Sequence, residues 1–177
     1  TYDITGALIS AIVTPQGNGA YDYKSVVGHD YLKSTMNGGK HNGKKEFFYP
    51  NGQVSETSEV FNGDTHGKYQ SFYPNGAKKD VGNYEYDLKV GEWIVYHHNG
   101  KVANKSTYQA GEIRDSSVSY YITGELESIY YYDVEGELTL QKYYHTSGAV
   151  NCIIPYEAGV IHGEYTNNDG FEEPVIS

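Results

Sequence analysis

The chain has 177 residues, with 20 tyrosines and 21 glycines beside one cysteine, one methionine and one tryptophan. A formal net charge of −10 argues against nucleic acid and anionic membrane surfaces as partners, because both repel an acidic protein. The single Cys152 excludes an intramolecular disulfide and a cysteine-based zinc site, and no stretch reaches the length of a transmembrane helix.

Residues 1–27 do not follow the pattern of the rest of the chain. They hold its most aliphatic stretch, which includes Ile4, Leu8, Ile9 and Ile12. We predict an N-terminal cap here, formed as a strand or a short helix. The first residue is not a methionine, which fits either a removed leader or a chosen boundary.

From residue 28 onward the chain repeats with a period of 24 residues, as the hexapeptides FFYPNG at 47–52 and SFYPNG at 71–76 show. One turn glycine recurs at this period: Gly28, Gly52, Gly76, Gly100, Gly124 and Gly148. An aromatic residue stands four positions before it: Phe48, Phe72, Tyr96, Tyr120 and Tyr144. We interpret this aromatic column as a ladder that holds a sheet together.

Each unit divides into two similar halves. A second column follows the turn glycine by eight residues: Val60, Tyr84, Tyr108, Tyr132 and Tyr156. A second turn comes after it, marked by Asn62-Gly63, Ala110-Gly111, Glu135-Gly136 and Ala158-Gly159. A further glycine opens the next unit at Gly43, Gly67, Gly91 and Gly163, and Asp115 and Thr139 break that column.

The distance between glycines leaves room for a short strand and a turn, and is too short for a helix. Asn-Gly favours tight hairpins because both residues accept positive φ. The sequence therefore predicts an all-β fold, an elongated single-layer antiparallel meander of stacked hairpins. Residues 28–170 would form five to six units, degenerate between 115 and 140, and residues 171–177 an acidic tail.

The segments GKYQSFYPNG at 67–76 and GEWIVYHHNG at 91–100 resemble the MORN repeat. More narrowly, they resemble a bacterial variant often labelled an antitoxin of toxin–antitoxin systems. The resemblance implies a twisted, single-layer sheet of hairpins with roles in protein contacts, membrane-proximal scaffolding and assembly. The segment YDVEGEL at 132–138 resembles instead the tyrosine–aspartate repeat of bacterial surface and toxin shells.

A second set of aromatic residues supplies the candidate binding site. Tyr49, Tyr73 and Tyr121 share one repeat position, and Tyr69 and Trp93 share another, four residues earlier. Since an even separation along a strand keeps side chains on one face, these five residues predict an exposed aromatic contact stripe. The alternative is that tyrosines simply cover both faces of the sheet.

No arrangement of residues predicts an enzyme, a cofactor or a metal site. His97 and His145 occupy one repeat position two units apart, too distant to share a metal ion in a regular array. We interpret histidine there as a replacement for the turn-proximal tyrosine. No phosphate-binding loop, nucleophile elbow or cysteine–histidine pair is present.

These observations favour a non-enzymatic module for protein interaction or scaffolding, in which the chain binds another protein, assembles with itself or joins a larger surface assembly. The alternatives are carbohydrate or cell-surface binding through exposed tyrosines, and an antitoxin-like neutralising role. Nucleic-acid binding and membrane insertion are not expected. The richness in Tyr, Asn, Ser, Thr and Gly favours an extracytoplasmic location over the cytoplasm.

Overall fold

A computed structural model describes residues 9–11, 17–24, 30–162 and 166–167 of the chain. All regular secondary structure in these residues is β-strand. The chain divides into two compact units, unit 1 at Thr1–Lys89 and unit 2 at Val90–Ser177. The boundary falls inside strand β8 (Leu88–Tyr96).

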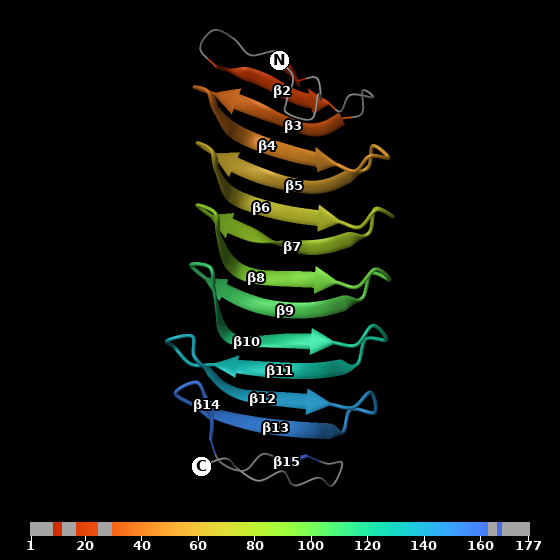
Figure 1. The fold of residues 1–177 in the computed structure, drawn as a ribbon, viewed down its shortest axis with the longest axis vertical. Helices are drawn as coiled ribbons and strands as arrows, with labels where there is room; N and C mark the ends of the chain where they lie inside the picture. The colour runs from red at the N-terminus through yellow and green to blue at the C-terminus, as the bar shows by residue number, and fades with distance from the viewer. Residues whose placement is uncertain (1–8, 12–16, 25–29, 163–165, 168–177) are drawn as a thin grey trace. The chain divides into compact units, whose positions relative to one another are not determined.

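Unit 1 is a meander in which each strand pairs antiparallel with the strand that follows it in sequence (Figure 1). Its strands are β1 (Ile9–Ala11), β2 (Gly19–Lys24), β3 (Asp30–Asn37), β4 (Lys40–Phe48), β5 (Val54–Phe61), β6 (Asp64–Phe72) and β7 (Lys78–Glu85). Pairs such as Ser58 with Tyr69, and Tyr69 with Gly82, set the register in the middle of these strands.

Unit 2 follows the same plan from β8 to β13, again with every strand antiparallel to the next. Its further strands are β9 (Val102–Gln109), β10 (Glu112–Tyr120), β11 (Leu126–Tyr132), β12 (Leu138–Tyr144), β13 (Val150–Glu157), β14 (Val160–Ile161) and β15 (Thr166–Asn167). Both β14 and β15 pair with β13. The predicted all-β, single-layer meander of hairpins is therefore confirmed within each unit.

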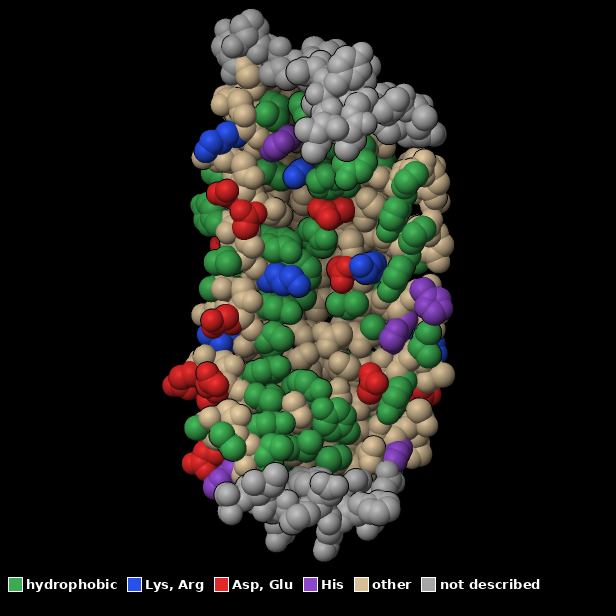
Figure 2. Space-filling model, in the orientation of Figure 1, with side chains coloured by type: hydrophobic (Ala, Val, Ile, Leu, Met, Phe, Trp, Pro, Cys, Tyr) green, Lys and Arg blue, Asp and Glu red, His purple; other side chains and the backbone are tan. Residues whose placement is uncertain are grey.

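The two faces of each unit differ in burial, because successive side chains of a strand point to opposite faces. In β5, Ser58 and Val60 are buried, whereas Glu59 and Phe61 are exposed. We call the face that carries Ser58 in unit 1, or Ser106 in unit 2, together with its register partners, the hydroxyl face. Figure 2 presents one face of the molecule, with hydrophobic side chains gathered over β11 to β13. Among the described residues, only Val60 and Trp93 are buried apolar residues, so neither unit has a thick core.

A β-bulge shapes the even-numbered strands near their first residues. In unit 1 the register shifts beside Gly43 and Gly67, whose φ values are 100° and 111°. In unit 2 the same shift occurs beside Asp115, at φ 62°. Such a bulge needs a left-handed residue, and aspartate tolerates this conformation better than most side chains. The glycine column thus breaks at Asp115 in sequence, while the bulge persists in structure.

Strands β1 and β2 lie within the predicted N-terminal cap of residues 1–27. The other residues of that cap, Gly28, Gly163 and the predicted tail at 171–177 fall partly or wholly outside the described residues. Within the described part of the chain, no helix is long and apolar enough to span a membrane.

Candidate functional site

Two turn tyrosines of the predicted stripe, Tyr49 and Tyr121, link successive hairpins through side-chain hydrogen bonds, which we call staples. The hydroxyl of Tyr49 donates a hydrogen bond to the carbonyl of Phe72 at 2.6 Å, and that of Tyr121 to the carbonyl of Tyr144 at 2.7 Å. At the equivalent position, Nε2 of His97 lies 2.8 Å from the carbonyl of Tyr120. Because a carbonyl only accepts, this nitrogen carries the proton, and histidine here does the work of tyrosine.

These staples start from a turn that the glycine column builds. In the first of them the amide of Gly52 donates to the carbonyl of Tyr49 at 2.9 Å, and the amide of Tyr49 donates to that of Gln53 at 2.8 Å. Tyr73 forms the same backbone turn with Gly76 and Ala77. The described turn glycines all have positive φ, between 81° and 103°: Gly52, Gly76, Gly100, Gly124 and Gly148.

The prediction that Trp93 belongs to an exposed stripe is wrong. Trp93 is 3% exposed, stands directly opposite Ser106 and meets Tyr108 edge-on at 6.2 Å between ring centroids. Tyr69 is likewise half-buried, between Ser58 and Gly82 on the flanking strands. The even-spacing argument failed because β4 ends at Phe48, so Tyr49 and its equivalents lie in turns where strand alternation no longer applies.

Small residues make room for these rings, and the sequence reasoning missed them. They recur every 24 residues in the odd-numbered strands and are all buried: Ser34, Ser58, Gly82 and Ser106. A large ring on one strand lies over a small residue on the next, as Trp93 does over Ser106. These residues form a fourth column of the repeat in the sequence, but a serine at a position does not by itself predict that the position is buried.

Polar groups of the hydroxyl face are bonded to one another. In unit 1, Ser71 Oγ donates to Asp80 Oδ2 at 2.5 Å, and Tyr69 Oη donates to Glu56 Oε2 at 3.1 Å. Burial, then the charge of Glu56, raises the pKa of the Tyr69 hydroxyl. These bonds satisfy groups that the sheet partly shields from water.

The hydroxyl face of unit 2 is bonded in the same manner. Asn104 Nδ2 donates to Ser117 Oγ at 3.0 Å and to Ser119 Oγ at 3.1 Å. The hydroxyls of Tyr130 and Tyr143 lie 2.8 Å apart. The face thus carries a network of hydrogen-bonded hydroxyls, and in unit 1 it also places Ser34 Oγ 2.7 Å from Nδ1 of His41.

Cys152 is partly buried in strand β13. Burial raises the pKa of the Cys152 thiol, which keeps it protonated and a poor nucleophile at neutral pH. Among residues 9–11, 17–24, 30–162 and 166–167, no group of three or more His, Cys, Asp or Glu side chains could hold a metal ion.

The opposite face of unit 2 is largely aliphatic. Its central row is made of residues directly opposite one another on β8 to β13: Ile94, Lys105, Val118, Ile129, Lys142 and Ile153. We call this set the aliphatic row. All six are partly exposed, and the register partners Tyr131, Leu140 and Pro155 extend the apolar surface on the same face.

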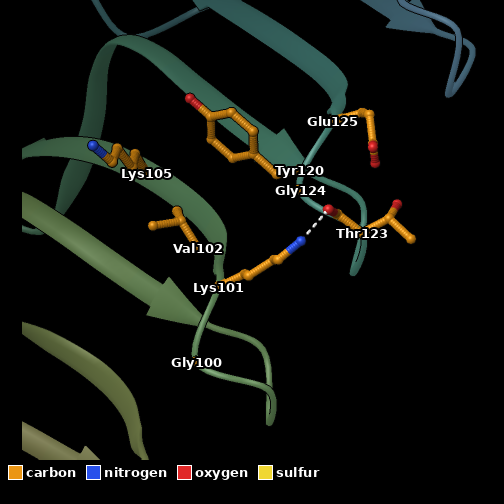
Figure 3. Close-up of a pocket in the computed structure, with 8 residues that line it drawn as sticks. All are labelled: Gly100, Lys101, Val102, Lys105, Tyr120, Thr123, Gly124 and Glu125. Atoms are coloured by element: carbon orange, nitrogen blue, oxygen red, sulfur yellow. Dashed lines mark hydrogen bonds between the residues drawn. The ribbon is translucent and has the colours of Figure 1, made fainter.

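A cavity of about 630 Å³ lies beside the aliphatic row (Figure 3). Its walls are Gly100, Lys101, Val102, Lys105, Tyr120, Thr123, Gly124 and Glu125. Lys101 Nζ donates to the carbonyl of Thr123 at 2.5 Å, whereas the side chain of Lys105 points away from Thr123 (Figure 3). The cavity therefore combines an apolar wall with the ammonium group of Lys101.

Comparison with known proteins gives one match. A family model described as a MORN repeat variant matches residues 42–62, 65–86 and 89–110. These three matches cover consecutive repeats of the 24-residue unit. None of the curated proteins matches the chain in sequence.

Proposed function

We propose that the chain, which carries three consecutive repeats of the MORN variant, is a non-catalytic scaffold that binds another protein across the aliphatic row of unit 2. Repeats of this family commonly serve in protein or membrane contacts, which is compatible with a scaffold. The hydrogen-bonded hydroxyls and the protonated thiol of Cys152 support a non-catalytic role.

The observation that carries this proposal is that the two units differ in the polarity of the face opposite the hydroxyl face. In unit 1 the central row there is polar, with Lys33, Glu46, Thr57 and Gln70 in register before Val81. In unit 2 four of the six positions are isoleucine or valine. A single-layer sheet leaves such side chains partly in water, and a partner that covers them gains the free energy of apolar burial.

The two lysines of the aliphatic row specify the chemistry of the partner. Lys105 lies between Ile94 and Val118, and Lys142 lies between Ile129 and Ile153, in a chain whose net charge is −10. In the described part of the chain neither ammonium group has an ion pair, and Lys142 Nζ lies 5.5 Å from the centroid of the Tyr131 ring. The row therefore fits an apolar segment that also carries carboxylates.

Selection of displayed random peptides on the full-length chain tests this proposal. We expect the enriched peptides to combine apolar residues with Asp or Glu. Val118→Asp and the charge reversal Lys105→Glu should both abolish their binding. The control Lys68→Glu reverses an exposed lysine of unit 1 and should leave binding unchanged.

Enriched peptides without acidic residues, or peptides that bind Lys105→Glu as well as the original chain, would refute this partner chemistry. Self-association in sedimentation that disappears in Val118→Asp would replace the peptide partner by a second copy of the chain. Carbohydrate binding through exposed tyrosines and an antitoxin-like role remain predictions.

A further inference from the structure

One hairpin turn of unit 1 breaks the rule that the others follow. The two central residues of the turn between β7 and β8 are Tyr86 and Asp87, at φ 48° and 64°. The corresponding second position is Gly39, Gly63, Gly111 or Gly159 in the other described two-residue turns of this kind, whereas the first position is also a non-glycine residue with positive φ at Asn62, Ala110 and Ala158. A left-handed residue with a side chain costs about 1–2 kcal/mol, so Asp87 adds strain that a glycine at the second position would remove.

The strain at Asp87 has a local compensation, and Tyr86 differs from the first residue of the other turns by its large exposed ring. The amide of Asp87 donates to the carbonyl of Thr65 at 2.9 Å, and Asp87 Oδ1 accepts from the amide of Thr65 at 2.7 Å. The ring of Tyr86 is 59% exposed and lies over His66 at 4.7 Å between centroids.

Tyr86 belongs to an exposed aromatic cluster. His66 lies between Tyr86 and Phe61, whose centroid is 6.1 Å from that of His66. Phe61 is 53% exposed and the neighbouring Leu88 is 48% exposed. Nδ1 of His66 is buried in this cluster without a hydrogen-bond partner among the described residues. Exposed aromatic rings around a buried nitrogen that lacks a hydrogen-bond partner are typical of a binding site.

Two acidic residues adjoin residues of the cluster. Asp64 stands directly opposite Phe61 across the tight turn, and Asp87 follows Tyr86. Only one oxygen of Asp87 is used by Thr65, so its carboxylate keeps acceptor capacity. Lys40 lies beside Gly63, on the preceding hairpin and therefore on the side away from Tyr86. Aromatic faces next to carboxylates favour a cation.

We propose that Phe61, His66 and Tyr86, together with Asp64 and Asp87, bind an arginine side chain of a partner protein. A guanidinium is planar and weakly hydrated, so it stacks on the exposed rings while its N–H groups reach the carboxylates. This site lies in unit 1 and does not depend on the aliphatic row of unit 2. Together the two sites would let the scaffold hold an arginine-bearing segment and an acidic, apolar one.

The test uses the full-length chain and the labelled peptide Gly-Ser-Arg-Gly-Ser-Arg-Gly in fluorescence anisotropy titrations. We expect saturable binding, weaker binding of the lysine version, and loss of binding when citrulline replaces arginine. Citrulline keeps the shape and removes the charge. Equal binding of the citrulline peptide, or no binding of the arginine peptide, would overturn the proposal.

Tyr86→Asn separates recognition from stability. Asparagine suits the left-handed turn position, so we expect an unchanged or higher melting temperature together with about tenfold weaker binding, as loss of a cation–π contact implies. Tyr31→Ser removes another exposed ring of unit 1 (Tyr31 is 52% exposed) and should leave the affinity unchanged.

Two further outcomes distinguish the possibilities. Unchanged binding by Tyr86→Asn, or a neutral oligosaccharide that competes with the peptide, would refute an arginine site. Lys105→Glu should not alter arginine-peptide binding, so failure of the scaffold surface on unit 2 and failure of this site are separable.

Discussion

The hydroxyl of Tyr49 donates a 2.6 Å hydrogen bond to the carbonyl of Phe72, which lies 23 residues further along the chain. Tyr121 and His97 make the same step to Tyr144 and Tyr120, also over 23 residues. A side chain at each of these turns therefore fastens the aromatic strand end of the next repeat. The bond joins a turn, in which main-chain pairing between strands has ended, to the last residue of a strand in the next repeat.

Removal of one staple should lower stability without changing the fold. Tyr49→Phe and Tyr121→Phe each delete the donor and leave the ring in place, so we expect a loss of about 1 kcal/mol in the free energy of unfolding. Urea denaturation measures the change. Tyr86→Phe, at an exposed tyrosine, is the control and should alter stability little. Wild-type stability in both staple variants would contradict a structural role for these hydroxyls.

Trp93 is the only tryptophan of the chain, so tryptophan fluorescence reports on the surroundings of this one side chain. Because Trp93 is 3% exposed, we expect blue-shifted fluorescence and weak quenching by iodide in the folded protein. Trp93→Ala should lower the free energy of unfolding by about 3 kcal/mol, as for other large buried side chains. Ready quenching in the folded state would show that the ring faces water.

The strands and turns could be predicted from the sequence because the repeat encodes them through glycine and aromatic residues at fixed spacing. The glycines at 52, 76, 100, 124 and 148 all have positive φ, as turn glycines require. The predicted binding stripe had no such basis. Its parity argument assumed an unbroken strand from Tyr69 to Tyr73, but β6 ends at Phe72.

The surfaces proposed here depend on relationships between strands, which a linear pattern does not display. Ile94 and Val118 share one repeat position, 24 residues apart, but only the register shows that Lys105 lies between them. The stack of Phe61, His66 and Tyr86 likewise joins two turns. The sequence shows that Tyr86-Asp87 lacks the glycine found in the second turn of other repeats. Only the backbone shows that both residues are left-handed.

Asp115 should be replaceable by glycine with a gain in stability. At φ 62° it adopts a conformation that costs a side-chain-bearing residue about 1 kcal/mol, and glycine adopts it freely. We expect a higher melting temperature for Asp115→Gly in calorimetry. The matched substitution Asp64→Gly, within β6, should lower it. A drop in stability for Asp115→Gly would mean that the carboxylate contributes more than the strained backbone costs.

Stability should fall at alkaline pH because of buried tyrosines. Burial raises the pKa of Tyr69 and of Tyr143, and the hydrogen bond with Tyr130 raises that of Tyr143 further. The folded state thus retains protons that the unfolded state loses, so the free energy of unfolding decreases as the pH rises above the ordinary tyrosine value of 10.0. Tyr69→Phe and Tyr143→Phe should each reduce this pH dependence in denaturation curves.

The turn-to-turn bond of Tyr49 with Phe72 also bears on how such a chain can change in length over evolution. A duplicated or deleted block of 24 residues restores every donor to a carbonyl of the same kind, so whole copies can be gained or lost with little penalty. An insertion of any other length places the wrong residue opposite the donor. Tandem duplication and deletion are therefore the expected route by which relatives of this protein would differ in size.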